Sequence, residues 1–208
     1  MIERLEFASC YAYSPRGTSN LALQSQTLCM RIKAADAEAF RLSADRVAVL
    51  YRAGHFTTFF GSDVALVPVP GRAPLAPGAV SRSQQICMAL VDRGLAGNSQ
   101  PLIERTHPVR KSAYAAPGER PTAQEHFETF TVDDATAVPR RVLLVDDVVT
   151  RGATFLGAAS RIREGFPETE IRAFALVRTE SYGELTAIQD PPEGHIELLP
   201  SGVTVRRP

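Results

Sequence analysis

Hydrophobic and polar positions along this chain follow two different periods. Largely apolar runs bounded by turn residues or charges occur within Asp63–Pro70, at Val142–Val145 and at Ile171–Val177. Runs this short and this rich in β-branched residues predict strands that are buried on both faces, as in a parallel sheet. Pro68 and Pro70 end the first run, because neither residue can donate a hydrogen bond to a neighbouring strand.

Helical spacing of apolar residues appears between these runs. It predicts helices over Ala37–Tyr51, Val80–Gly94 and Ala153–Gly165. Asp36 is a suitable N-cap for the first helix, and Gly54 is a suitable end. Strand, helix and strand in this order predict right-handed crossover units of an α/β fold.

The remaining patterns are shorter. Leu5–Tyr11, Leu102–Arg105 and Phe127–Val132 read as short strands, and Ile196–Leu199 can pair with Val203–Val205 as a hairpin. The first 63 residues are otherwise expected to be α-rich.

Composition narrows the class of protein. The 208 residues suit one soluble domain, with 44% hydrophobic and 22% charged residues. A formal net charge of zero gives no support to nucleic-acid or membrane-surface binding, and no apolar run approaches the ~20 residues of a membrane span. Cys10, Cys29 and Cys87 are scattered, which predicts a reducing, cytoplasmic setting without a zinc ribbon or disulfide framework.

The chemistry of the chain is concentrated in Arg141–Thr154, which reads RVLLVDDVVTRGAT. The strand is expected to stop at Asp146 and Asp147, and ligands of α/β sheets collect at the carboxyl ends of strands. Gly152 allows a tight turn and a close approach of backbone to ligand. The N–H groups that begin the next helix form an anion site. The stretch therefore offers two carboxylates that can bind hydroxyl groups or a metal, followed by backbone N–H groups that can bind a phosphate.

A hydrophobic strand, D-D-x-x-T-x-G-x-T and a helix resemble the phosphoribosyl diphosphate (PRPP) motif of type I phosphoribosyltransferases. The resemblance implies an α/β fold of that type, with a mostly parallel sheet flanked by helices and a small hood formed by the termini. It also implies that Asp146 and Asp147 hold the ribose hydroxyls. The 5′-phosphate would then be bound by Thr150, Arg151, Gly152, Ala153 and Thr154. Arg151 departs from the small or hydroxylic residue that is usual at its position.

Two other motifs compete for these residues. A P-loop requires a Gly-Lys-Ser/Thr ending, and this stretch contains no lysine. A response-regulator receiver also carries paired acids after a strand, but it needs a lysine downstream, and the last lysine of this chain is Lys111.

The turn after Asp63–Pro70 is the second site candidate. In type I phosphoribosyltransferases this turn wraps the diphosphate of PRPP, which assigns that role to Pro70, Gly71 and Arg72. The sequence V-P-V-P resembles the motif of the ComF branch of the family, although the N-terminal zinc segment of many ComF relatives is not found in this sequence. A plain surface turn remains an alternative, and Arg82 reads equally as a diphosphate ligand or a surface charge.

The stretch Thr106–Gln124 is basic, contains Gly and Pro, and has no apolar period. Loops this long are either functional or disordered. The resemblance implies a mobile loop that closes over PRPP, with Arg110 on the diphosphate and Lys111 as a catalytic residue beside Asp146 and Asp147. A solvated loop is the alternative.

Together these features predict a single domain, with an N-terminal part at 1–62, a PRPP-binding core at 63–180 and a tail at 181–208. The expected reaction transfers phosphoribose from PRPP to a nitrogen acceptor, a nucleobase being the expected one, with release of diphosphate. Mg²⁺ is the expected cofactor, held by Asp146 and Asp147 directly or through water. A non-catalytic PRPP or nucleotide sensor is the alternative. The partners are small molecules, with neither nucleic acid nor membrane, and a homodimer is left open.

Overall fold

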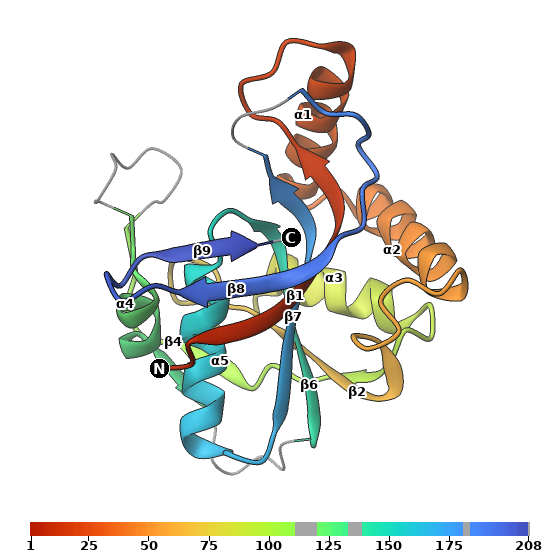
Figure 1. Ribbon diagram of the computed structural model, residues 1–208. Helices are drawn as coiled ribbons and strands as arrows, with labels where there is room; N and C mark the ends of the chain where they lie inside the picture. Colours follow the sequence, from red (N-terminus) through yellow and green to blue (C-terminus); the bar gives the residue numbers. More distant parts are fainter. Residues whose placement is uncertain (111–119, 133–138, 181–183, 208) are drawn as a thin grey trace.

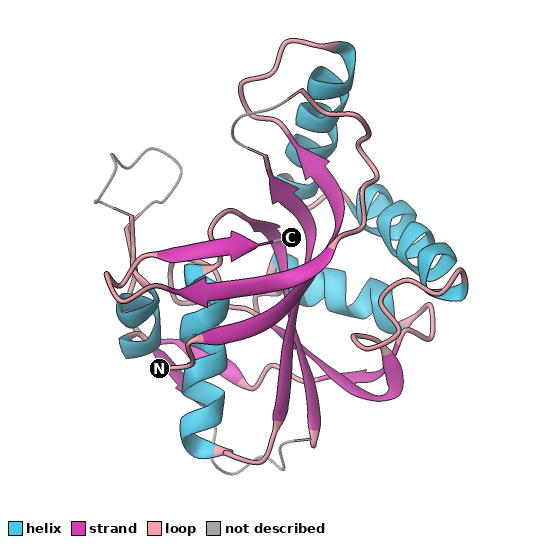
Figure 2. Ribbon diagram, in the orientation of Figure 1, coloured by secondary structure: helices cyan, strands magenta, loops and turns pink. Residues whose placement is uncertain are grey.

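A mixed sheet runs through the molecule, and helices cover both of its faces (Figures 1 and 2). The computed structural model describes residues 1–110, 120–132, 139–180 and 184–207. The strands are β1 (Arg4–Tyr13), β2 (Gly61–Pro68), β3 (Ala96–Ser99), β4 (Ile103–Arg105), β5 (Phe130–Val132), β6 (Arg141–Val149), β7 (Glu170–Thr179), β8 (Glu193–Leu198) and β9 (Thr204–Arg207). The helices are α1 (Asn20–Lys33), α2 (Ala37–Arg52), α3 (Arg82–Val91), α4 (Ala123–Glu128) and α5 (Ala153–Gly165).

The main sheet has seven strands in the order β3-β2-β6-β7-β1-β8-β9. The five strands from β3 to β1 run parallel, and β8 and β9 are antiparallel additions at one edge. Strands β4 and β5 form a separate antiparallel pair. The predicted α/β architecture, with a mostly parallel sheet flanked by helices, is confirmed.

Strand β6 lies at the centre of the parallel part, and the residues Val142–Val145 are almost completely buried. The prediction that the strand stops at Asp146 and Asp147 is wrong. Pairing with β7 continues as far as Val149, opposite Arg178, so both acids lie inside the strand. On the other side β2 ends at Pro68, opposite Val145. The acids therefore keep a neighbouring strand on one side only.

Two apolar cores fill the spaces between the sheet and its helices. Helices α1, α2 and α3 pack on one face around residues such as Phe56, Leu66 and Phe174. Helices α4 and α5 pack on the other face around residues such as Phe155 and Leu144. Buried side chains on both faces explain why the central strands read as continuous apolar runs rather than alternating ones.

The N-terminal strand is longer and more central than the sequence predicted. Strand β1 pairs in parallel with β7 and antiparallel with β8, and Phe7, Ala8 and Cys10 are buried in it. Both ends of the chain thus add strands to the main sheet. Helix α1 stands beyond the carboxyl ends of β1 and β7 (Figure 1).

Helix α4 takes the place of the first part of a predicted strand. Phe127–Val132 was expected to be extended, but only Phe130–Val132 is. The hydroxyl of Thr122 accepts a hydrogen bond from the backbone of Glu125, and the Glu125 carboxylate accepts one from the backbone of Thr122. This capping box starts a helix that the β-rich composition around Phe130 concealed.

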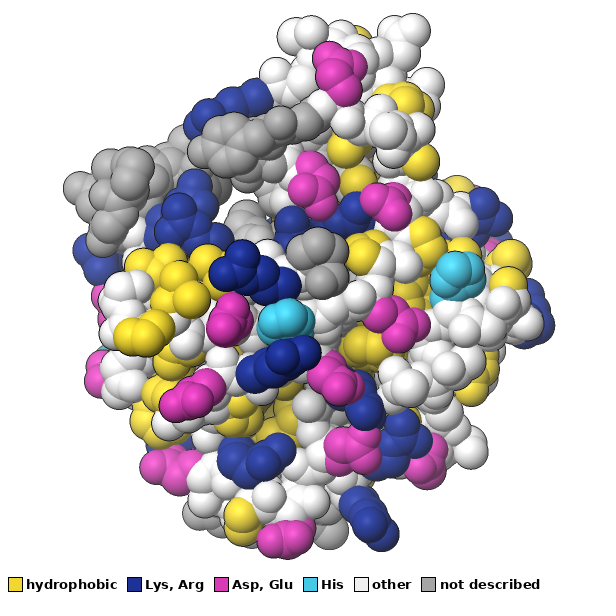
Figure 3. Space-filling view, in the orientation of Figure 1, with side chains coloured by type: hydrophobic (Ala, Val, Ile, Leu, Met, Phe, Trp, Pro, Cys, Tyr) yellow, Lys and Arg dark blue, Asp and Glu magenta, His cyan; other side chains and the backbone are white. Residues whose placement is uncertain are grey.

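No helix in the described part of the chain combines the length and the apolarity needed to cross a membrane. Basic and acidic side chains are interspersed over the face shown in Figure 3, as the zero net charge suggests. Cys10, Cys29 and Cys87 are free and buried.

Gly157 controls how closely α4 and α5 approach. A Cβ at this position would lie 2.6 Å from His126 Cβ, 2.8 Å from the Ala123 carbonyl oxygen and 2.9 Å from the Phe127 nitrogen. We expect Gly157→Ala to lower the free energy of unfolding by about 1–3 kcal/mol, because backbone atoms of α4 must move. Urea unfolding followed by circular dichroism measures this change. Gly165→Ala, at the open end of the same helix, is the matched control and should be neutral or slightly stabilising. Equal effects at both positions would contradict the close approach.

Candidate functional site

The acid pair lies against the first turn of α3. Asp146 Oδ1 accepts a hydrogen bond from Ser83 Oγ at 3.2 Å, and Asp147 Oδ2 lies 2.9 Å from Arg82 Nε. Ser81 caps this helix, so the positive end of its dipole points toward the acids. Arg82 also donates to the Lys33 carbonyl at 2.9 Å, which joins α1 to the same site. Arg82 is thus an ion-pair partner of Asp147, which leaves both alternatives for this arginine in place.

The turn after β6 contains a backbone conformation that glycine adopts readily. Gly152 is the N-cap of α5 with φ +93°, a left-handed conformation that other residues adopt only with strain. Thr150 and Arg151 are exposed, whereas Ala153 and Thr154 are half-buried in the first turn of the helix. The five residues that were assigned to the phosphate therefore form one continuous turn.

The C-terminal hairpin lies over this turn. A Cβ on Gly152 would lie 2.5 Å from Ile196 Cδ1, so the side chain of Ile196 covers the glycine. Arg206 is opposite Ile196 in the hairpin, and it donates to the Thr179 carbonyl at 2.7 Å. Nothing in the local sequence of the hairpin indicated contact with a loop more than 40 positions earlier.

The Pro70–Arg72 turn faces the segment that follows β4. The Gly71 carbonyl accepts a hydrogen bond from Arg105 Nε, and the Arg72 carbonyl accepts one from the Val109 N–H at 2.8 Å. Pro70 is half-buried, and Gly71 and Arg72 are exposed. The predicted diphosphate turn thus touches the beginning of the predicted mobile loop.

Arg105 and His126 form a buried polar pair that the sequence did not indicate. They are 5% and 4% exposed, and Arg105 Nη2 lies 3.1 Å from His126 Nδ1. The guanidinium is 4.2 Å from the centroid of the Phe130 ring, and Nη1 donates to Thr129 Oγ1 at 2.5 Å. On the other side of the imidazole, Nε2 lies 3.3 Å from Thr154 Oγ1. The pair therefore connects the Gly71 turn with the first turn of α5.

Burial sets the protonation states around this pair. Burial lowers the pKa of Arg105 to about 10, although the nearby Asp146 opposes the shift. Burial and the Arg105 charge lower the pKa of His126 to about 4. Burial, reinforced by the Asp147 charge, raises the pKa of Asp146 well above its ordinary value. At neutral pH a charged arginine therefore lies beside a neutral histidine and faces an acid of raised pKa.

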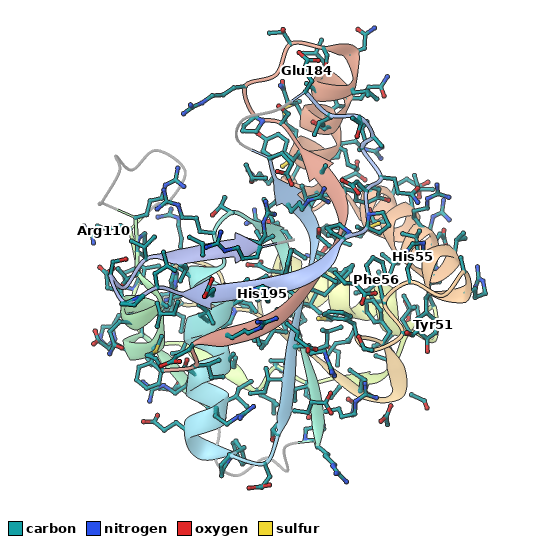
Figure 4. All side chains as sticks on the ribbon, in the orientation of Figure 1. Tyr51, His55, Phe56, Arg110, Glu184 and His195 are labelled. Carbon is teal, nitrogen blue, oxygen red and sulfur yellow. The ribbon has the colours of Figure 1, made fainter. Side chains whose placement is uncertain are left out.

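Other predicted or plausible ligands lie elsewhere. Arg110 forms an ion pair with Glu125 of α4 at 2.7 Å, and Figure 4 shows it at the edge of the molecule. Lys111 lies outside the described residues. Arg178, at the carboxyl end of β7, is buried and engaged by Glu180 and Asp190.

The donor set at the acid pair suits a metal that is held mainly by its substrate. Among the described residues, no group of three or more His, Cys, Asp or Glu could hold a metal ion. Asp146 and Asp147 supply two carboxylates, and Mg²⁺ typically takes one or two carboxylates together with substrate phosphates and waters. Two surface hollows lie at the other end of the sheet, one beside Arg140 and Gly165 and one beside Phe130 and Arg161.

Comparison with solved structures returns adenine phosphoribosyltransferases from three organisms. The Saccharomyces cerevisiae enzyme, crystallised with adenine and D-2,5-dideoxy-2,5-imino-altritol 1,6-bisphosphate, is 18% identical over 66% of this chain and 68% of its own, with a TM-score of 0.37. The Leishmania tarentolae enzyme is 15% identical over 82% and 84%, with a TM-score of 0.38. The Leishmania donovani enzyme is 16% identical over 86% and 84%, with a TM-score of 0.32.

No protein-family model and no curated protein matches the chain. Because the identities and TM-scores of the structural matches are low, a function for this chain has to be inferred from its own residues.

The depressed pKa of His126 predicts a pH-dependent stability. The unfolded histidine takes up a proton near its ordinary pKa of 6.5, whereas the folded one stays neutral down to about 4. Stability linked to the neutral His126 is therefore fully present above pH 6.5 and is lost as the pH falls. The free energy of unfolding should be lower by roughly 3 kcal/mol at pH 4. Urea unfolding of the wild type and of His126→Gln between pH 7 and pH 5 measures it.

The raised pKa of Asp146 acts in the opposite direction in both proteins, so the difference between the two curves isolates His126. Parallel curves would show that the folded histidine titrates normally.

Proposed function

We propose that this protein binds PRPP with Mg²⁺ and transfers its phosphoribosyl group to a nitrogen acceptor, with a nucleobase as the expected acceptor. The observation that carries the proposal is the placement of three elements at one edge of the sheet. The acid pair lies where β2 has ended, the Gly152 turn begins α5 immediately after it, and the Pro70–Arg72 turn follows β2. Acids for ribose hydroxyls and backbone N–H groups for a phosphate are the donors and acceptors that PRPP requires.

In such a reaction the bond from ribose C1 to the diphosphate oxygen breaks, and a bond from C1 to the acceptor nitrogen forms. The diphosphate leaves with the bonding electron pair. The residues contribute by orienting PRPP and by excluding water, rather than by forming a covalent bond. Asp146 and Asp147 would hold the ribose hydroxyls and the Mg²⁺, which supplies neutralisation of the diphosphate charge.

Arg82 is suited to a change of partner during binding. Its side chain is 47% exposed and pairs with Asp147, so it can turn toward a diphosphate without leaving a buried cation unpaired. Asp147 would then be released for the sugar or the metal. In this scheme Arg82 is an accessible charge paired with Asp147 before PRPP binds and a diphosphate ligand afterwards.

A sensor that binds PRPP without turnover is the second candidate. It is favoured by Arg110, which pairs with Glu125 rather than with a residue of the acid edge. Release of diphosphate separates the two candidates. An enzyme releases diphosphate from PRPP in the presence of a suitable acceptor, whereas the sensor binds PRPP and releases none with any nucleobase.

Isothermal titration with PRPP and Mg²⁺ tests the site itself. We expect Mg²⁺-dependent binding by the wild type and its loss in Asp146→Asn/Asp147→Asn, because each charged hydrogen bond contributes about 2–3 kcal/mol. Asp92→Asn, an exposed aspartate at the C-cap of α3, is the matched control and should bind normally. Failure of the wild type to bind at millimolar PRPP, or unchanged binding in the double variant, would contradict the proposal.

A further inference from the structure

The buried Arg105–His126 pair lies between the two turns that the proposed function assigns to the phosphates of PRPP. Arg105 Nε donates to the Gly71 carbonyl in one turn, and His126 Nε2 reaches Thr154 Oγ1 in the other. Both side chains are almost fully buried, and their polar atoms contact other groups of the protein. Buried polar groups of this kind cost free energy unless their hydrogen bonds are made, so their arrangement constrains the chain.

The chemistry of arginine sets the direction of every hydrogen bond in this chain of contacts. A guanidinium has only donors, so the contact of Arg105 Nη2 with His126 Nδ1 requires Nδ1 to accept. A neutral imidazole that accepts at Nδ1 carries its proton on Nε2. Nε2 is therefore the donor toward Thr154 Oγ1. The positive charge of Arg105, in turn, disfavours the imidazolium form.

The hydroxyl of Thr154 consequently accepts from histidine and keeps its own hydrogen available. Within the described parts of the chain, Thr154 Oγ1 donates to no carbonyl or carboxylate. Thr154 lies in the first turn of α5, where Gly152 has φ +93° and the free N–H groups of the helix begin. Its hydroxyl hydrogen is thus a donor on the same turn as the backbone donors.

We propose that His126 is a positioning residue that fixes the Thr154 hydroxyl as a hydrogen-bond donor to a phosphate monoester, and that Arg105 fixes the tautomer of His126. The inference rests on the proposed function, because it concerns the turn that would hold the 5′-phosphate of PRPP. His126 acts through Thr154 and touches no substrate. The second bond of Arg105, to the Gly71 carbonyl, ties the diphosphate turn to the same guanidinium.

A purely structural role would look different in a double-mutant cycle. His126 stacks on Phe130 with ring centroids 6.0 Å apart, so its loss also affects packing. Packing defects lower stability whether or not Thr154 has a hydroxyl. A histidine that acts through the hydroxyl has no effect on phosphate binding once that hydroxyl is gone.

The experiment measures the affinity for ribose 5-phosphate by isothermal titration in His126→Phe, Thr154→Val and the double variant. We expect each single variant to bind roughly tenfold more weakly and the double variant to be no weaker than either, because one hydrogen bond to an anion is lost in all three. Thr154→Ser and His126→Gln should retain most of the affinity, since each keeps the group that donates. His55→Phe, an exposed histidine beyond the end of α2, is the matched control (Figure 4). Losses that add in the double variant would overturn the proposal.

Nitrogen-15 NMR of the imidazole tests the tautomer directly, without a ligand. We expect a neutral His126 that carries its proton on Nε2 at pH 7, and a proton on Nδ1 or an imidazolium would overturn the inference even if His126→Phe does not fold. The outcomes also separate this inference from the proposed function. If the protein binds PRPP but the losses in the double-mutant cycle are additive, only the positioning role of His126 is contradicted. If the protein binds neither PRPP nor ribose 5-phosphate, both the positioning role and the proposed function are contradicted.

Discussion

The organisation of this protein depends on an unequal pairing of strand β6. The strand is hydrogen-bonded to β7 as far as Val149 but to β2 only as far as Val145, because β2 ends at a proline-rich turn. A strand that loses one neighbour exposes backbone and side chains on that side. The two aspartates occupy the stretch where the pairing is one-sided, so β7 holds their backbone while their side chains contact the first turn of α3.

Segments that are far apart in the chain meet around the acids and the turn after β6. The first turn of α3 supplies Arg82 and Ser83 to the acids, and the C-terminal hairpin places Ile196 over Gly152. The hairpin reaches the turn because β8 pairs with β1, which itself lies beside β7 in the main sheet. A site assembled from five or more segments on a rigid sheet is better suited to hold a charged ligand in one geometry than a site on a single loop.

Charge at this edge is distributed between the two faces of the sheet. On the face of α3, Arg82 is accessible and pairs with Asp147, whereas on the face of α4, Arg105 is buried beside a neutral His126. A buried cation keeps its charge only where hydrogen-bond acceptors surround it, and Gly71, Thr129 and His126 provide them. The result is one accessible and one buried positive charge near the acids.

The sequence by itself determined the α/β class, the buried parallel strands, the N-cap at Asp36 and the tight turn at Gly152 between β6 and α5. These features depend on local periodicity and on backbone chemistry, which act over a few residues. The capping box at Thr122 and Glu125 is also present in the sequence, but Thr122 was assigned to the loop Thr106–Gln124 and Phe127 to the strand that follows.

Only the tertiary structure decided that β6 runs through the acids, that β1 is central, and that Arg82, Arg105, His126 and Ile196 meet at the site. No spacing in the sequence connects these residues, because contacts between them arise from strand order and from the packing of α3, α4 and the hairpin onto the sheet. An isolated arginine in a sequence is most often a surface residue, and a histidine is intermediate. Their burial, which determines their charge and the direction of their hydrogen bonds, exists only once the elements have packed.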